Sequence, residues 1–227
     1  MSALSPARRL LKLVHPEGLP VVGSFLYNAV SGTEAFQRTY EVLADDIANH
    51  RPEGSLLDIG TGPAWLLVKL HELLPDLELT GLDLSSTMVA KARENIEGAG
   101  LADRIEMKEG NASGLPFPDG AFDTVVSTQS IHHWKDPTAA LNEVHRVLRP
   151  GGLALLYDLV SDTPGPILKD LAREFGRARM WFLWIHAFEE PFYSRYGLEE
   201  LARPTAFGEG QTRFVSVCCC LTLHKQA

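Results

Sequence analysis

From residue 52 onward the sequence alternates short apolar segments with longer amphipathic ones, and this alternation limits the fold more than any other feature. Buried strands are expected at 55–59, 78–83, 105–109, 124–128 and 153–159. Helices are expected at 65–74, 86–98 and 137–148, and Pro75 and Pro150 would end the first and the last of them. Short strands that alternate with helices form βαβ units, whose parallel sheet is covered by helices on both faces. The sequence therefore predicts an α/β fold.

Residues 1–51 precede this core and are expected to form a helical lid or substrate-binding segment. A helix is expected at 32–49, because Phe36, Tyr40, Leu43 and Ile47 recur at helical spacing. The core is expected to span 52–227, with a helical insertion rich in aromatic side chains at about 162–204. The apolar segment 214–223 is predicted to be one further strand.

The composition restricts the class of protein. The chain has 227 residues, enough to bury a core without disulfides, and its formal net charge is −8. A negative net charge disfavours a nucleic-acid partner, because it repels the phosphate backbone. The most apolar aromatic stretch, 180–188, is far shorter than the ~20 residues that span a bilayer, and no secretory leader is recognisable. We therefore expect a cytoplasmic protein without a membrane span that acts on a small molecule.

A glycine turn follows the first predicted strand and opens the next helix. It contains Asp58, Gly60, Thr61 and Gly62. In an open α/β sheet this is where a ligand meets the strand ends, and glycine lets the backbone approach that ligand closely. Asp83 ends the second strand, where its carboxylate can accept hydrogen bonds from a ribose diol. Glycine turns occur in many βαβ proteins, so this turn alone does not choose the cofactor.

A dinucleotide-dependent dehydrogenase is the nearest alternative for such a turn. Its G-x-G-x-x-G fingerprint would require a glycine at position 65. Trp65 stands there, and its side chain is too large for the close packing of helix and strand that this glycine permits. The dehydrogenase is therefore disfavoured.

Four motifs occur in order along the chain: LLDIGTGPA, LTGLDLS, EGNASGLPFPDGAFDTVVS and LNEVHRVLRPGG. Together they resemble the class I S-adenosylmethionine-dependent methyltransferases, in particular the small-molecule branch with the ubiquinone and menaquinone C-methyltransferases. The resemblance runs from about residue 55 to 160. It implies a Rossmann-like, seven-stranded, mostly parallel sheet whose last strand is antiparallel, with S-adenosylmethionine as cofactor and S-adenosylhomocysteine as product.

The resemblance also implies a role for each matching position. Asp58 would meet the methionine amino group, and the glycine turn would pass close to the amino-acid end of the cofactor. Asp83 would hold the ribose hydroxyls, and Leu84 would pack beside the adenine. Asn111 replaces the aspartate that this family often has before Ala112, and its side-chain carbonyl can still accept the adenine amino group. The implied cofactor-binding set is Asp58, Gly60, Thr61, Gly62, Asp83, Leu84, Asn111, Ala112 and Thr128.

Methyl transfer needs a base only where the acceptor arrives protonated, so no catalytic signature is obligatory. His132, just past the fourth strand, is the candidate general base and a candidate substrate contact. Tyr27 and Tyr193 are candidates for lining the acceptor site. The resulting prediction is an enzyme that transfers a methyl group from S-adenosylmethionine to a small-molecule acceptor. A non-catalytic S-adenosylmethionine-binding scaffold or sensor is the alternative.

Cys218, Cys219 and Cys220 are adjacent, so they are expected to point to alternate faces of a strand and form no disulfide. Packing in a buried strand explains them, and a metalloid acceptor bound by Cys218 and Cys220 remains open as a second interpretation. No metal cofactor is expected. The expected partners are the methyl acceptor and a second copy of the chain in a homodimer.

Overall fold

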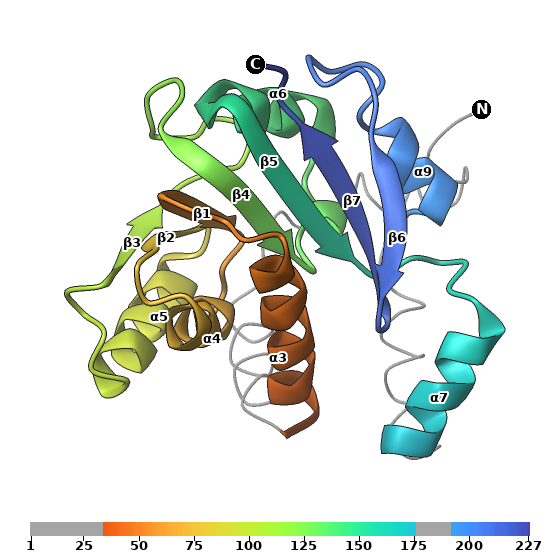
Figure 1. Cartoon of the computed structure of the whole chain (residues 1–227), viewed down its shortest axis with the longest axis horizontal. Coiled ribbons are helices and arrows are strands. Elements are labelled where there is room, and N and C mark those ends of the chain that lie inside the picture. Colours follow the sequence, from red (N-terminus) through yellow and green to blue (C-terminus); the bar gives the residue numbers. More distant parts are fainter. Residues whose placement is uncertain (1–33, 176–191) are drawn as a thin grey trace.

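The structure is a computed structural model that describes residues 34–175 and 192–227. These residues form a seven-stranded sheet with the order β3-β2-β1-β4-β5-β7-β6 (Figure 1). Strand β7 is antiparallel to β5 and β6, and the other neighbouring strands are parallel. The strands are β1 (Ser55–Ile59), β2 (Glu78–Asp83), β3 (Ile105–Glu109), β4 (Phe122–Thr128), β5 (Leu148–Asp158), β6 (Gln211–Val215) and β7 (Cys218–His224). The predicted α/β class and the mostly parallel sheet are confirmed.

Helices cover both faces of the sheet (Figure 1). One face packs against α3 (Glu34–Asn49), α4 (Trp65–Leu73) and α5 (Ser86–Gly98), and the other against α6 (Pro137–Val147) and α9 (Arg195–Glu200). Successive strand residues contribute to opposite layers, as Leu56 and Leu57 do in β1. Two core layers therefore enclose the sheet. The remaining elements are the 3-10 turn η1 (Ile131–His133) and α7 (Gly165–Phe175).

Helices α5, α6 and α9 begin at side chains that accept hydrogen bonds from the first helical turn. Ser85 caps α5 by accepting from the N–H of Met88 at 3.4 Å, and Asp136 caps α6 by accepting from the N–H of Ala139 at 2.9 Å. Ser and Asp are favoured at this position because their side chains accept from the unpaired N–H groups of a first turn. Since the strands β1 to β5 are parallel, the loops after them meet at one edge of the sheet, where the site lies.

The last predicted strand is wrong in one respect. Segment 214–223 is not one strand: β6 and β7 form a hairpin whose two-residue turn is Ser216 and Val217. Ser216 has a φ of 52°, which hairpin turns require but which is typical of Gly or Asn rather than Ser. The turn was therefore not recognisable from residue type. Strand β5 also begins earlier than predicted, at Leu148, because Gly151 and Gly152 exchange backbone hydrogen bonds with Lys225 after β7.

The boundaries 1–51 and 52–227 remain a prediction, as does the lid. Only α3 of the N-terminal segment is among the described residues, and the proposed insertion contributes α7 and α9 from its described part. Tyr40, Leu43 and Ile47 of α3 are buried against the sheet, as their spacing predicted. Among residues 34–175 and 192–227, the structure has no helix that is both long and apolar enough to cross a membrane.

Candidate active site

The turn after β1 lies so close to the loop after β4 that no side chain would fit between them. Gly60 has a φ of 73°, and a Cβ placed on it would lie 2.1 Å from Oγ of Ser130. The N–H groups of Gly60 and Thr61 both donate to the carbonyl of Leu82 at the end of β2, at 2.8 and 3.1 Å. Gly62 also has a positive φ, of 55°. Glycine at these positions therefore lets three loops meet at one edge of the sheet.

Ala64 stands where the family often has a third glycine, and it precedes α4 with a φ of 64°. A left-handed backbone costs a residue with a Cβ about 1–2 kcal/mol. The turn therefore keeps its shape without that glycine, at the expense of local strain.

Asp58 lies beneath this turn and is completely buried. The Thr61 hydroxyl donates to its Oδ2, whereas Oδ1 has no hydrogen-bond partner among the described residues. Burial raises the pKa of the Asp58 carboxyl to about 7, against the hydrogen bond from Thr61 and with a further rise from nearby Asp83. A buried acceptor without a partner costs about 1–3 kcal/mol. A cationic donor such as a methionine ammonium group would satisfy it.

Asp83 ends β2 and connects two parts of the same edge. Its Oδ2 accepts the N–H of Gly62 at 2.8 Å, and its Oδ1 accepts the N–H of Ser85 at 2.9 Å. Burial raises the pKa of Asp83, and hydrogen bonds from the backbone oppose that rise. An ionised carboxylate offers about four acceptor sites, so these backbone donors leave room for hydrogen bonds from a ligand diol. Leu84 follows it and is 38% exposed, an apolar surface beside this carboxylate.

Asn111 and Ala112 lie in the loop after β3. The side-chain carbonyl of Asn111 accepts the N–H of Ser113 at 2.8 Å, so it shapes its own loop and keeps one further acceptor site. Arg146 and Glu143 of α6 hold the following stretch, because Glu143 accepts the N–H of Leu115 and Arg146 donates to the Leu115 and Phe117 carbonyls. The ion pair of Glu143 and Arg146 is thus structural.

The loop after β4 brings in the candidate base. Thr128 ends β4 and is largely buried, and the next residue, Gln129, adopts a φ of 51° while its N–H donates to the Tyr157 carbonyl at 2.7 Å. This turn leads into η1, which carries His132. His132 is 4% exposed, and its Nδ1 lies 2.8 Å from Oδ1 of Asp158 at the end of β5. Sequence reasoning missed Asp158.

Tyr193 is buried near this pair, and its carbonyl accepts the N–H of Ser161 at 2.8 Å. The ring of its neighbour Phe192 meets that of His132 edge to face, with centroids 4.5 Å apart. The structure thus brings Tyr193 to the His132 region, while its role toward an acceptor stays a prediction. Tyr27 lies outside the described residues.

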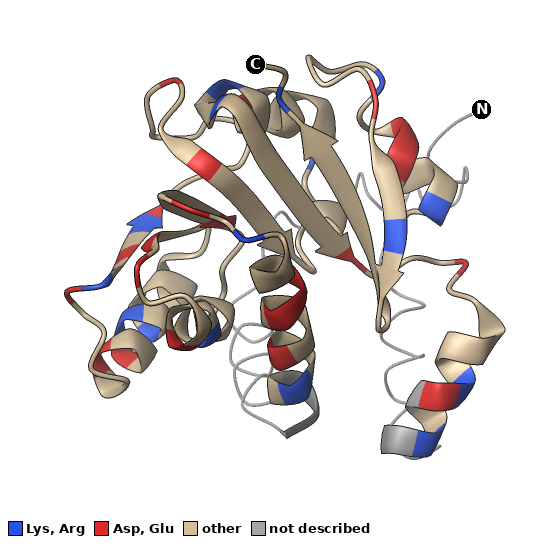
Figure 2. Cartoon of the chain, viewed as in Figure 1, with Lys and Arg blue, Asp and Glu red and all other residues tan. Residues whose placement is uncertain are grey.

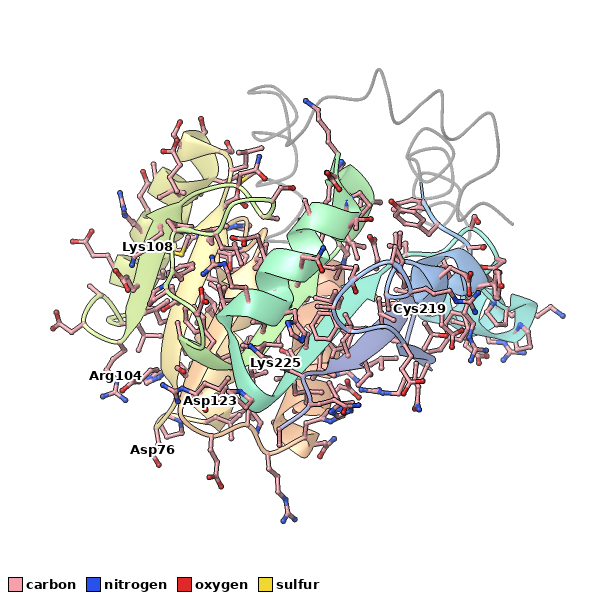
Figure 3. The ribbon with its side chains drawn as sticks, turned by 90° about the horizontal axis from the view of Figure 1, so that it is seen from above. Asp76, Arg104, Lys108, Asp123, Cys219 and Lys225 are labelled. Carbon is pink, nitrogen blue, oxygen red and sulfur yellow. The ribbon has the colours of Figure 1, made fainter. Side chains whose placement is uncertain are left out.

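The three cysteines are all buried and have free thiols. Cys218 and Cys220 belong to one core layer and Cys219 to the other (Figure 3 labels Cys219). Burial raises the pKa of each thiol, that of Cys220 to about 11. A neutral thiol is a poor metal ligand. Residues 34–175 and 192–227 contain no group of three or more His, Cys, Asp or Glu side chains placed to hold a metal ion.

Comparisons with known proteins agree with this geometry. Residues 57–156 match the family model of the methyltransferase domain. Over 115 residues the chain is 39% identical to a demethylmenaquinone methyltransferase of Thermus thermophilus, which covers 51% of this chain and 51% of that protein. Over 194 residues it is 28% identical to an O-methyltransferase of Penicillium expansum, covering 82% of this chain and 66% of that one.

Solved structures share the fold. A candidate S-adenosyl-L-methionine-dependent methyltransferase from Methanococcus maripaludis superimposes with a TM-score of 0.70 at 23% sequence identity, over 94% of this chain and 96% of that chain. By contrast, the chain spans about half the length of the Thermus protein and about two thirds of the Penicillium protein.

The strand order, the site at the carboxyl edge and these matches point to one class of protein: residues 57–156 match the methyltransferase domain, and the fold is that of solved S-adenosylmethionine-dependent methyltransferases. The chain is similar to demethylmenaquinone methyltransferases over 51% and 71% of its length. S-adenosylmethionine is the cofactor that this class implies, in agreement with the sequence-based prediction.

Proposed function

We propose that the whole chain is an enzyme that transfers a methyl group from S-adenosylmethionine to a small-molecule acceptor. The observation that carries the proposal is the carboxyl edge of the sheet. There a buried carboxylate oxygen of Asp58, which has no partner in the described part of the chain, lies under a glycine turn that Asp83 holds from the other side. This arrangement fits an ammonium group at one end of a ligand and a diol at the other.

Within this proposal each residue of the edge has one task. Asp58 would bind the methionine ammonium group, and Gly60, Thr61 and Gly62 would pass along the methionine end. Asp83 would accept the ribose hydroxyls, while Leu84, Asn111 and Ala112 would enclose the adenine and Thr128 would border the site. When bound, S-adenosylmethionine supplies a methyl group activated by its sulfonium. The chain then has to orient the acceptor, exclude water and, where the acceptor is protonated, take its proton.

The nature of the acceptor is also part of the proposal. The similar proteins include a demethylmenaquinone methyltransferase and an O-methyltransferase, which favours a small acceptor. The net charge of −8 disfavours a nucleic acid, and Figure 2 shows Lys and Arg spread over several elements of the described part rather than gathered on one face. We propose a cytoplasmic enzyme, with a homodimer as the assembly that size measurements would test.

Calorimetric titration with S-adenosylmethionine, S-adenosylhomocysteine and NAD tests the cofactor. We expect both adenosyl ligands to bind in the micromolar range and NAD to give no heat. Asp83→Ala should weaken the adenosyl ligands at least about tenfold, which is roughly 1.4 kcal/mol. The matched control is Asp76→Ala, because Asp76 is exposed and lies at the edge where the parallel strands begin, as do Asp123 and Lys225 (Figure 3).

Two outcomes would contradict the proposal. Folded protein that is free of carried-over cofactor and gives no heat with either adenosyl ligand would contradict cofactor binding. Tight binding without transfer of labelled methyl groups to any acceptor in extract fractions would favour the scaffold or sensor, since a pure binder transfers nothing.

A further inference from the structure

A buried carboxylate that the proposed cofactor site does not use lies beside it. Asp158 ends β5 and is 1% exposed. Its Oδ2 accepts the backbone N–H of His132 at 2.9 Å, and its Oδ1 accepts the N–H of Leu159 at 2.8 Å. Nδ1 of His132 lies 2.8 Å from Oδ1 and 2.9 Å from Oδ2. Asp158 therefore binds both the backbone and the ring of His132.

These contacts assign the proton of the imidazole. A backbone N–H is always a donor, so both oxygens of Asp158 act as acceptors. An ionised carboxylate has acceptor sites only, and Nδ1 can therefore approach it at this distance only as N–H. In a neutral imidazole the lone pair is then on Nε2. His132 is thus oriented with its basic nitrogen on the side of the ring away from Asp158.

Four described residues surround this pair: His133, Phe192, Tyr193 and Cys218. The ring of His133 lies against that of His132, with centroids 4.0 Å apart, and the Phe192 ring covers another side. Tyr193, before α9, and Cys218, at the start of β7, lie within electrostatic range of Asp158. Burial first, and then the charge of Asp158, raises the pKa of both groups, so each stays neutral at neutral pH. Among these described neighbours, Asp158 alone is anionic.

The pair lies at the edge that would hold the cofactor. Ser130, two residues before His132, is the residue that a Cβ on Gly60 would strike. Nε1 of Trp134 donates to the same Ser130 hydroxyl at 3.2 Å, which fixes the turn around His132. The loop that carries His132 is therefore in direct contact with the glycine turn.

We infer that Asp158 is a positioning residue, which holds His132 with its proton on Nδ1 so that Nε2 can take a proton from the methyl acceptor. The inference rests on the proposed function and deepens it, because it assigns the class of acceptor: a molecule with an acidic O–H or C–H bond at the atom that is methylated. In this step the acceptor–H bond breaks, an Nε2–H bond forms, and the electron pair stays on the acceptor atom. Asp158 stabilises the resulting imidazolium, which later releases its proton to water.

The tautomer can be tested on the full chain without any acceptor. Long-range ¹H–¹⁵N spectra of ¹⁵N-labelled protein report which ring nitrogen carries the proton, and His132→Gln identifies the signals of His132. We expect Nδ1–H in the wild type. In Asp158→Asn the amide oxygen replaces only one of the two carboxylate oxygens, and the NH₂ that replaces the other can donate to Nδ1 but cannot accept from it, so the proton should move to Nε2.

The matched control is His145→Gln, since His145 lies on α6 against Phe207 and away from the pair. It should leave the His132 signals unchanged. A proton on Nε2 in the wild type, or the same tautomer in Asp158→Asn, would overturn the inference whatever the cofactor experiments show.

A kinetic experiment tests the acceptor class. The probe is 1,4-naphthohydroquinone kept reduced, which offers acidic O–H groups and adjacent ring C–H positions, with methyl-labelled S-adenosylmethionine. We expect wild type and His145→Gln to methylate it. His132→Gln and Asp158→Asn should each lower kcat at least about 100-fold, as loss of a general base does, while their affinity for S-adenosylhomocysteine stays unchanged.

The outcomes separate the inference from the function on which it rests. Asp158→Asn with kcat within about threefold of the wild type, less than the loss of a general base produces, contradicts the positioning role. Methylation of N,N-dimethylaniline, which attacks with a free lone pair, without methylation of the hydroquinone contradicts the acceptor class. A chain that binds S-adenosylmethionine and methylates neither probe contradicts the proposed function itself, and the base role fails with it.

Discussion

At the residue scale, Asp58 combines a proposed binding role with a cost in stability. Burial raises its pKa from 3.8 to about 7, and the Thr61 hydroxyl only partly opposes that rise. The folded chain thus binds this proton more tightly than the unfolded chain does. The contribution of the group to stability is complete below the unfolded pKa of 3.8 and is lost as the pH rises toward the folded pKa.

Replacement of Asp58 by Asn should remove the loss of stability that the ionisation of Asp58 causes as the pH rises. The amide keeps the shape of the side chain and an oxygen that accepts from Thr61, but it does not ionise. We expect the ligand-free variant to gain stability relative to the wild type between about pH 5 and about pH 8, by on the order of 1–4 kcal/mol. Urea unfolding of both proteins at several pH values measures the gain. A stability difference that does not change with pH would show that Asp58 is not the titrating group.

Single residues also show which part of the candidate site could be predicted from the sequence and which could not. His132 was identifiable as a candidate base, because it follows a strand that ends at the cofactor edge. Asp158 was not, since it lies 26 residues further along the chain and only the parallel pairing of β4 and β5 brings the two strand ends together. An Asp at the end of a predicted strand, in the segment LLYDLV, was the available signal, and the same signal had identified Asp83.

At the element scale, a polar network fixes α3 to the sheet. Asp46 of α3 accepts from Nη1 and Nη2 of Arg213 on β6, at 2.7 and 2.6 Å, and from the Tyr157 hydroxyl on β5 at 2.7 Å. Burial alone would raise the pKa of Asp46, but the hydrogen bonds from Arg213 and Tyr157 and the charge of Arg213 outweigh it, and the pKa is lowered. Asp46 therefore stabilises the fold above its unfolded pKa, and this contribution is lost on acidification.

Asp46→Asn should therefore destabilise the protein at neutral pH. Hydrogen bonds to a charged group contribute about 1.5–3 kcal/mol, and we expect a loss of about that size in urea unfolding near pH 7. The difference from the wild type should shrink as the pH falls through the carboxyl range. Asp45→Asn is the matched control, because Asp45 is the exposed neighbour on the same helix. Equal effects of the two substitutions would contradict a specific role of the network.

The β6–β7 hairpin allows a test of backbone strain. Ser216 is exposed and has a φ of 52°, a conformation that costs residues with a Cβ about 1–2 kcal/mol. Ser216→Gly should raise the free energy of unfolding by about 0.5–1 kcal/mol, since glycine removes that strain but adds backbone entropy to the unfolded chain. Ser216→Val should lower it. Thermal unfolding of the three proteins would rank them, and a Val variant at least as stable as the Gly variant would contradict the argument.

At the scale of the whole molecule, the order of strands and helices was predictable because each βαβ unit carries its own periodicity and its own caps. The hairpin was not, because a Ser-Val turn has no glycine or asparagine to mark it. The predicted burial of the three adjacent cysteines in a strand is confirmed, and alternate residues of that strand enter opposite core layers. Sequence alone could not show how the four motifs come together, because that depends on the parallel alignment of β1, β2, β3 and β4.

From that alignment we predict how amide hydrogen exchange of the whole chain changes when S-adenosylhomocysteine is added. Ligand at about 100 times its Kd stabilises a folded protein by roughly 2.7 kcal/mol, which slows every amide that exchanges through global unfolding. Amides that exchange through local opening should respond only where the ligand binds. We therefore expect added protection in 60–64, 83–85 and 129–132, three segments that are separate in sequence and share the carboxyl edge. The amides of Gly120 and Gly151, which donate to Arg146 and Lys225 at the opposite edge, should keep their rates. Exchange under NAD should match the ligand-free protein, and protection at both edges alike would contradict a site confined to the carboxyl ends of the strands.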